Sequence, residues 1–214
     1  MANSKKISAQ SEHKNKYLVL FISDNPEKQN ELIQSLSHSV YKVCAVLPVS
    51  CLITNQPESK LLIDDLKNFK PNIIVIDVLS PQACFYESIQ AIVQHKQIPI
   101  IMFSAEEGTQ HVPHLIKSGV TTYIVNKSNF TGINTIIISA SAYFDQLQQL
   151  QKELSVTKNK LANLRTIEQA KFLLMQNKQY SEQEAYHCMR KMAMDNGHKL
   201  EDIAKNVLSL AAIL

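Results

Sequence analysis

Short apolar segments alternate with amphipathic segments along the first two thirds of the chain. The apolar segments are rich in Ile and Val and bounded by Asp, Asn, Pro or Gly, which is typical of strands buried on both faces of a parallel sheet. They cover residues 17–22, 40–47, 72–77, 98–104 and 121–126. The amphipathic segments between and after them, which predict helices, cover 26–37, 59–69, 84–95, 111–118 and 131–144. This alternation predicts a doubly wound α/β domain with a five-stranded parallel sheet over 17–140, whose ligands bind at the carboxyl ends of the strands.

The hydrophobic pattern changes after Ala140. Apolar residues then recur at alternating spacings of three and four, with polar Thr157 in the same series, which indicates the a and d positions of a coiled coil over 141–164. The apolar members of this predicted seam are Tyr143, Leu147, Leu150, Leu154, Leu161 and Leu164. A homodimer is the expected result. The alternative is one long helix that packs its apolar stripe against its own domain.

The remaining residues, 165–214, predict a small all-α domain of three helices. The helical pattern runs on from the coiled coil to about Met175 and breaks near residues 177–180. Ser181 and Glu184 have the spacing of a capping box, which opens a second helix ending before Gly197. A third amphipathic helix is expected over about 199–210.

Composition and charge place the chain among soluble globular proteins. Hydrophobic residues make up 45% and charged residues 19% of the 214 residues, and no apolar segment is long enough to span a membrane. Residues 1–16 contain no signal-peptide core and predict a disordered, Lys-rich tail. The four cysteines show no CxxC spacing, so we expect reduced thiols and a cytoplasmic protein.

The ends of the predicted strands carry a group of polar residues that resembles the site of receiver domains from two-component response regulators. Ser23 and Asp24 follow the first strand, where that family has an acidic pair. Asp77 ends the third strand and precedes Pro81 by four residues, as the family's phosphoacceptor Asp does. Ser104 and Tyr123 match the family's two switch positions, and the resemblance covers 17–140.

Two departures from the receiver pattern bear on phosphorylation. Ser23 replaces one carboxylate, and Asn126 stands where the family has its Lys, with Lys127 displaced by one residue. Transfer of a phosphoryl group to Asp needs Mg²⁺ held by carboxylates and a cation to offset the developing charge. Asp24 and Asp77 can hold Mg²⁺ only weakly, so we expect a docking surface for a protein, with no cofactor. The alternatives are an Asp77 that is phosphorylated with Mg²⁺, or one that merely caps the next turn.

The C-terminal segment resembles the ANTAR domain, an RNA-binding antiterminator domain named after AmiR and NasR. The match spans about 160–210 and departs at Phe172 and Met189. The matching residues are Arg165, Ile167, Glu168, Gln169, Ala170, Lys171, Leu174, Met175, Ser181, Glu184, Ala185, Arg190, Ala193 and Met194. The resemblance implies that this domain binds RNA.

An excess of basic residues over 158–199 is consistent with an anionic partner, since eight basic and four acidic residues lie there. Helical modules contact RNA phosphates through Lys and Arg, and loop bases through Arg planes or amides. The predicted RNA-binding residues are Arg165, Gln169, Lys171, Lys178, Arg190, Lys191 and Lys199, with Ala170 as a small residue that lets RNA approach. Apart from weak Mg²⁺ binding at Asp24 and Asp77, no metal site is expected in the protein.

The order of receiver-like domain, coiled coil and ANTAR domain resembles the NasT-type regulators of nitrate and nitrite assimilation. This resemblance implies a dimeric antiterminator, not an enzyme, that binds tandem stem-loops in a nascent leader mRNA and affects RNA polymerase only indirectly. It also implies an inhibitory nitrate- or nitrite-sensing partner. One alternative is a phosphorelay regulator that dimerises when Asp77 is phosphorylated. Another is a DNA-binding protein or adaptor, although no helix-turn-helix with a basic recognition helix is evident.

Overall fold

A computed structural model describes residues 17–53, 57–106, 110–125 and 130–211. The predicted N-terminal tail and Asn126 lie outside these residues. The chain divides into two compact units, Met1–Gln146 and Leu147–Leu214, and the division falls within the predicted coiled-coil segment. None of the helices in the described ranges is long and apolar enough to cross a membrane.

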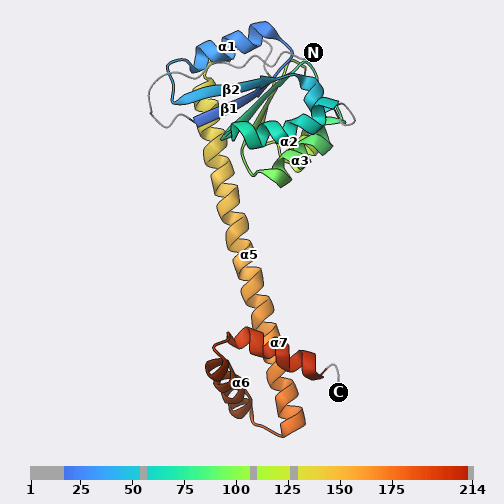
Figure 1. Cartoon of the computed structure of the whole chain (residues 1–214), viewed down its shortest axis with the longest axis vertical. Coiled ribbons are helices and arrows are strands. Elements are labelled where there is room, and N and C mark those ends of the chain that lie inside the picture. Colours follow the sequence, from blue (N-terminus) through green and yellow to red (C-terminus); the bar gives the residue numbers. More distant parts are fainter. Residues whose placement is uncertain (1–16, 54–56, 107–109, 126–129, 212–214) are drawn as a thin grey trace. The chain divides into compact units, whose positions relative to one another are not determined.

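The first unit is built on a five-stranded sheet in the order β2-β1-β3-β4-β5 with all strands parallel (Figure 1). The strands are β1 (Tyr17–Ile22), β2 (Tyr41–Leu47), β3 (Ile73–Val78), β4 (Ile100–Ser104) and β5 (Thr122–Val125). The helices between them are α1 (Pro26–Leu36), η1 (Val49–Leu52), α2 (Pro57–Phe69), α3 (Phe85–His95) and α4 (Val112–Ser118). The predicted doubly wound α/β fold is confirmed.

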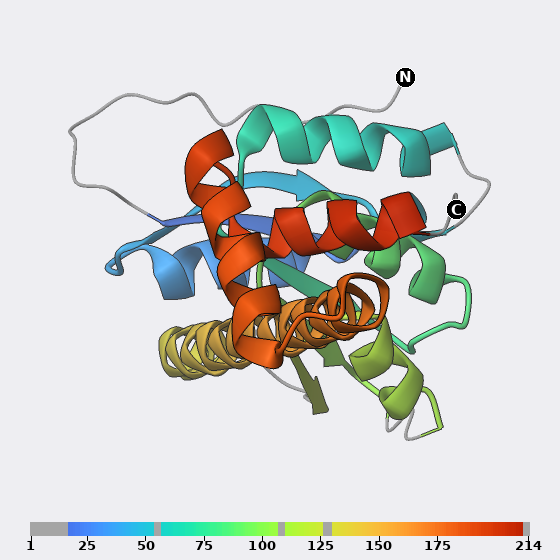
Figure 2. The same ribbon diagram turned by 90° about the horizontal axis from the view of Figure 1, so that it is seen from below.

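Two apolar layers cover the two faces of the sheet, because the side chains of each strand alternate between the faces. On one face, α2, α3 and α4 pack against strand residues such as Leu20 and Ile74. On the other face, α1 and the start of α5 pack against residues such as Phe21 and Val75. Figure 2 shows α1 and α2 on opposite sides of the strands.

One short element, the 3-10 helix η1, has no counterpart among the predicted elements. It follows β2 directly and buries Cys51 and Leu52 in the core. A single turn is too short to show a helical hydrophobic period, so the sequence pattern does not reveal it.

Helix α5 (Ile133–Lys178) is one continuous helix of 46 residues. It covers the predicted last helix of the α/β domain together with the coiled coil and the first ANTAR-like helix, and the sequence pattern already joins the last two into one helix. Its first turns bury Ile133, Ile137 and Ala140 against the sheet, and its last turns bury Ala170 in the second unit. The middle of the helix is exposed.

The second unit closes α5 against α6 (Glu182–Asn196) and α7 (Leu200–Ala211). The chain turns at Gln179, which has a φ of 53°. The predicted capping box is confirmed, because the Ser181 side chain accepts from the backbone of Glu184 while the Glu184 carboxylate accepts from the backbone of Ser181. Gly197 ends α6 in the left-handed conformation, with a φ of 64°. A small core forms from Ala170, Met189, Ala193, Ile203, Ala204 and Val207.

Candidate functional site

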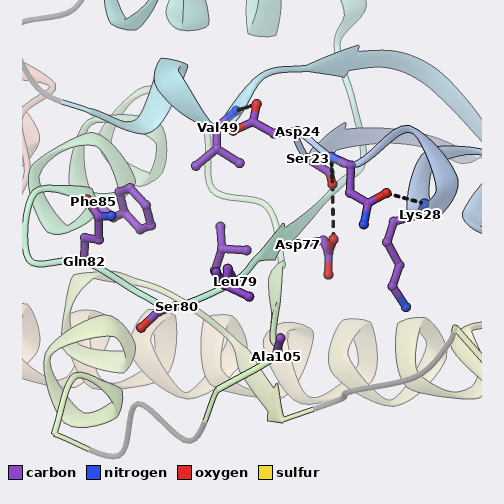
Figure 3. Close-up of a pocket in the computed structure, with 12 residues that line it drawn as sticks. Ser23, Asp24, Lys28, Val49, Asp77, Leu79, Ser80, Gln82, Phe85 and Ala105 are labelled. Atoms are coloured by element: carbon purple, nitrogen blue, oxygen red, sulfur yellow. Dashed lines mark hydrogen bonds between the residues drawn. The ribbon is translucent and has the colours of Figure 1, made fainter.

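An open cavity of about 460 Å³ lies at the carboxyl ends of β1 and β3 (Figure 3). These two strands are neighbours in the sheet, so the residues that follow them meet at one edge. The cavity brings together the predicted residues Ser23, Asp24 and Asp77. The other lining residues are Asn25, Lys28, Val49, Val78, Leu79, Ser80, Gln82, Phe85 and Ala105.

Asp77 is held by Ser23 at the floor of this cavity. The Ser23 hydroxyl donates to Oδ2 of Asp77 over 3.1 Å, and Ser23 is almost fully buried. Burial raises the pKa of Asp77, while the hydrogen bond from Ser23 and the positive charge of Lys28 act in the opposite direction. Serine at position 23 therefore supplies a hydrogen-bond donor to Asp77 where a second carboxylate would repel it.

Asp24 is directed away from Asp77. Its Oδ1 accepts from the backbone N–H of Val49 over 2.9 Å, which fixes the start of η1, and Figure 3 shows its side chain beside Val49. The alternative of a weak Mg²⁺ site shared by Asp24 and Asp77 gains no support from this arrangement, because Asp24 points to Val49 and not to Asp77. Across the described ranges, no group of three or more His, Cys, Asp and Glu gathers to hold a metal ion.

Lys28 is a cavity residue that the sequence analysis did not identify. It lies on α1, forms an ion pair with Glu31 (Nζ to Oε2, 3.5 Å) and stands 5.5 Å from the centre of the Phe130 ring. Its charge partly opposes the rise in the pKa of Asp77 that burial causes. Its position in the first turn of the helix after β1 could have indicated this role, because that turn lies at the carboxyl end of the sheet.

The two predicted switch residues lie outside the cavity lining. Ser104 is fully buried, and its Oγ lies 2.8 Å from the carbonyl oxygen of Glu106 and 3.2 Å from that of Leu79. Tyr123 is half-buried and donates its hydroxyl hydrogen to the carbonyl of Glu106 over 3.4 Å. Both side chains therefore bind the loop after β4 and do not bind Asp77.

Replacing Asp77 by Asn tests the burial of this carboxylate. Because the pKa of Asp77 is raised in the folded protein, the wild type gives up stability as the pH rises through that pKa. We expect Asp77→Asn to be the more stable protein at pH 7, with the difference shrinking as the pH falls to about 4, near the pKa of unfolded Asp. Urea unfolding of both proteins across this range measures the difference. A variant that is less stable than wild type at pH 7 contradicts this account.

The predicted RNA-binding residues of the second unit divide into exposed and buried members. The exposed members are Arg165, Gln169, Lys178, Arg190, Lys191 and Lys199. Arg190 and Lys191 lie together on α6 and line an open hollow of about 280 Å³ with His187, Met194 and Asp195. Met194 is among the residues that match the ANTAR pattern, whereas His187 and Asp195 were not identified as site residues from the sequence, although their spacing on α6 places them on the same face.

Lys171 is not the exposed cation that the sequence predicts. It is only 8% exposed, and its Nζ lies 2.8 Å from Oε1 of Glu168 and 2.7 Å from Oε1 of Glu182. The hydrogen bonds with Glu168 and Glu182 raise the pKa of Lys171. Since Glu182 begins α6, the bond from Lys171 to Glu182 connects α5 to the start of the next helix, while Glu168 lies one turn earlier on α5 itself. Lys171 therefore holds the two helices together in this structure.

The role expected for Ala170 is wrong. Ala170 is fully buried and packs in the core with Met189 and Ile203. Its small size allows α5 to approach the other two helices closely, so its surface is not open to RNA. The neighbouring Phe172 is 60% exposed.

The predicted dimer seam is an exposed apolar stripe along α5. Each of its apolar residues is between 38% and 59% accessible in the single chain. They are Tyr143, Leu147, Leu150, Leu154, Leu161 and Leu164. Exposed large apolar side chains in such a row are typical of an interaction surface.

Residues 156–208 match the ANTAR domain family. The chain is 23% identical over 139 residues to the transcriptional regulatory protein PdtaR of Mycobacterium tuberculosis, covering 65% of this chain and 68% of that protein. It is 37% identical over 68 residues to the nitrate regulatory protein of Klebsiella oxytoca, covering 32% of this chain and 17% of that protein. Both relatives carry the names of regulatory proteins.

Solved structures with similar folds include two signalling proteins. A two-component response regulator of the LuxR family from Aurantimonas has 16% identity and a TM-score of 0.48, covering 65% of this chain and 99% of that chain. The signal receiver domain of a diguanylate cyclase from Desulfovibrio desulfuricans has 15% identity and a TM-score of 0.47, covering 61% and 98%. The segment 156–208, which matches the ANTAR domain family, thus follows a doubly wound α/β domain with strand order 2-1-3-4-5.

Proposed function

We propose that this regulator, with its ANTAR domain behind a receiver-like domain, is an RNA-binding transcription antiterminator. It binds tandem stem-loops in a nascent leader mRNA as a homodimer and prevents the terminator hairpin from forming. The observation that carries this proposal is the match of residues 156–208 to the ANTAR domain. The exposed cations on that domain, including Arg190 and Lys191, supply charge for RNA phosphates.

The dimer explains how two stem-loops are bound at once. Apolar residues along α5, among them Leu154 and Leu161, are about half exposed and are available to a second copy. Two ANTAR domains on one coiled coil turn the second stem-loop contact into an intramolecular step, which raises affinity without new contacts. The affinity for each stem-loop alone can then be modest.

We also propose that the genes controlled are those of nitrate and nitrite assimilation, through a sensor protein that sequesters the regulator until its ligand is present. The similarity to the nitrate regulatory protein supports this choice. The receiver-like domain is the proposed docking surface for the sensor. Sequestration requires that the sensor bind a form of the regulator whose RNA-binding faces are not available, since a partner shifts an equilibrium only through differential affinity.

A gel shift with a two-hairpin leader RNA, with and without the candidate sensor, tests substrate and regulation together. We expect the double variant Arg190→Ala, Lys191→Ala to weaken RNA binding and to flatten the salt slope by about 0.7–0.9 for each phosphate that is no longer neutralised. Lys117→Ala is the control, since Lys117 is an exposed cation on α4 of the other unit. Unchanged binding in the double variant refutes the placement of the RNA on α6.

The second candidate function is a phosphorelay response regulator with Asp77 as phosphoacceptor. Its support is the position of Asp77 in an open cavity at the end of β3. Because Asp24 is engaged by Val49, we expect no stable phosphorylation. Intact-protein mass spectrometry after incubation with a small phosphodonor and Mg²⁺ measures it. A mass increase of one phosphoryl group that disappears in Asp77→Asn would establish this second function.

A further inference from the structure

The heptad positions of α5 give each charged residue beside the seam a defined neighbour in a parallel dimer. The seam spacing makes Leu147, Leu154 and Leu161 a positions and Leu150 and Leu164 d positions. The residues just before an a position are then g residues, and those just after a d position are e residues. In parallel coiled coils, a g residue of one helix faces the e residue of the following heptad on the other helix.

Applied to α5, this rule gives one attractive and one repulsive contact on each side of the dimer. Glu153 at g faces Lys158 of the second copy, which favours the parallel arrangement. Lys160 at the next g position faces Arg165 of the second copy, so two cations meet there. This inference rests on the dimer of the proposed function, and it concerns a site that one chain alone does not complete.

The charge at this second contact is not neutralised within the chain. Lys160 and Arg165 are both exposed, and neither takes part in the ion pairs found among the described residues. The nearest acidic residue along the helix, Glu168, binds Nζ of Lys171 over 2.8 Å. Four cations, two on each flank of the coiled coil, therefore lie within the ANTAR domain at 156–208.

We propose that Lys160 of one copy and Arg165 of the other form a composite phosphate-binding site on each flank of the coiled coil, occupied by the RNA backbone. A phosphate between the two cations replaces their repulsion by two attractive contacts. RNA binding and dimerisation then stabilise each other, because any ligand that binds only the dimer shifts the monomer–dimer equilibrium toward it. The site reads charge and not sequence, since phosphates carry no base information.

The substitution Lys160→Glu distinguishes a phosphate-binding site from a purely structural role of Lys160, because we expect it to strengthen dimerisation and to weaken RNA binding. A carboxylate at position 160 would attract Arg165 of the second copy, so we expect the dimer without RNA to become about tenfold tighter. Binding of a short oligouridylate should weaken about tenfold, and its salt slope should flatten by about 1.4, because the two flanks each neutralise one phosphate fewer. Analytical ultracentrifugation measures the dimer, and fluorescence anisotropy at low ionic strength measures the RNA.

Lys152→Glu is the matched control, since Lys152 is an exposed lysine of the same helix at an f position, away from the seam. We expect it to leave the dimer unchanged and to weaken oligouridylate binding by less than about threefold. The proposal is overturned if the two variants behave alike, or if Lys160→Glu weakens both dimer and RNA binding. Failure of the proposed function gives a different result. The wild type would then not bind the two-hairpin leader RNA, while Lys160→Glu would still weaken oligouridylate binding.

Discussion

Leu154→Asp should convert the protein to a monomer and lower its affinity for a two-hairpin RNA by about 10²–10⁴, the range that linking two binding modules contributes. Leu154 is an a position near the middle of the exposed stripe and is 54% accessible in the single chain. A carboxylate there would be buried between two helices without a partner, which is strongly unfavourable. Binding of a single stem-loop should not change, because the core of the second unit does not include Leu154. Sedimentation velocity and gel shifts with one-hairpin and two-hairpin RNAs measure these effects.

Val156→Asp is the control for this experiment. Val156 is 45% exposed on the same helix, two residues away, but lies at a c position off the seam. It loses a branched apolar side chain and gains the same charge, so it controls for a new carboxylate on the exposed part of this helix. The additional loss of helix propensity in Leu154→Asp is only about 0.5 kcal/mol, which is too small to account for loss of the dimer. We expect it to remain dimeric and to keep its two-hairpin affinity. A dimeric Leu154→Asp would show that the stripe on α5 is not the dimer interface.

Most of the fold followed from the sequence because its signals are local. Runs of Ile and Val predicted the strands to within two residues at either end, and Ser181 with Glu184 predicted the cap of α6. The pattern joined the coiled coil to the first ANTAR-like helix but placed a separate helix at 131–144, so the full length of α5 was predicted only in part. Three separate packing environments lie along one helix, and a pattern that changes from a buried face to an exposed stripe suggests a boundary where the backbone has none.

The site was less predictable because its contacts cross long stretches of sequence. Lys171 donates to Glu182, which lies beyond the turn at Gln179. Asp24 is engaged by Val49, at the start of a helix that the pattern does not reveal. Both residues were identified from the sequence, but the hydrogen-bond partner of each depends on how two elements pack. Periodicity places a residue on a face of its own element and does not name its neighbour.

Met189→Ala should unfold the second unit selectively and abolish RNA binding with it. Met189 is fully buried, and half of the six residues in that core are alanines, so few atoms can move to fill the space it leaves. Removing a buried Met side chain typically costs about 2–5 kcal/mol, which is a large part of the stability of a small unit. The first unit should keep its melting temperature, because neither of its apolar layers contains Met189. Circular dichroism and differential scanning calorimetry should show one transition lowered by about 10 °C or more and the other unchanged.

Met194→Ala separates this packing effect from the loss of a methionine on α6. Met194 lies on the same helix, but it is 73% exposed, so its truncation should change the free energy of unfolding by less than about 0.5 kcal/mol. Both variants keep every cation proposed to bind RNA. If Met189→Ala lost RNA binding while the unit stayed folded, the side chain itself would contact RNA, which its burial excludes. If both transitions fell together, the two units would unfold as one cooperative body, and RNA binding would depend on the α/β core as much as on the helices that carry the charge.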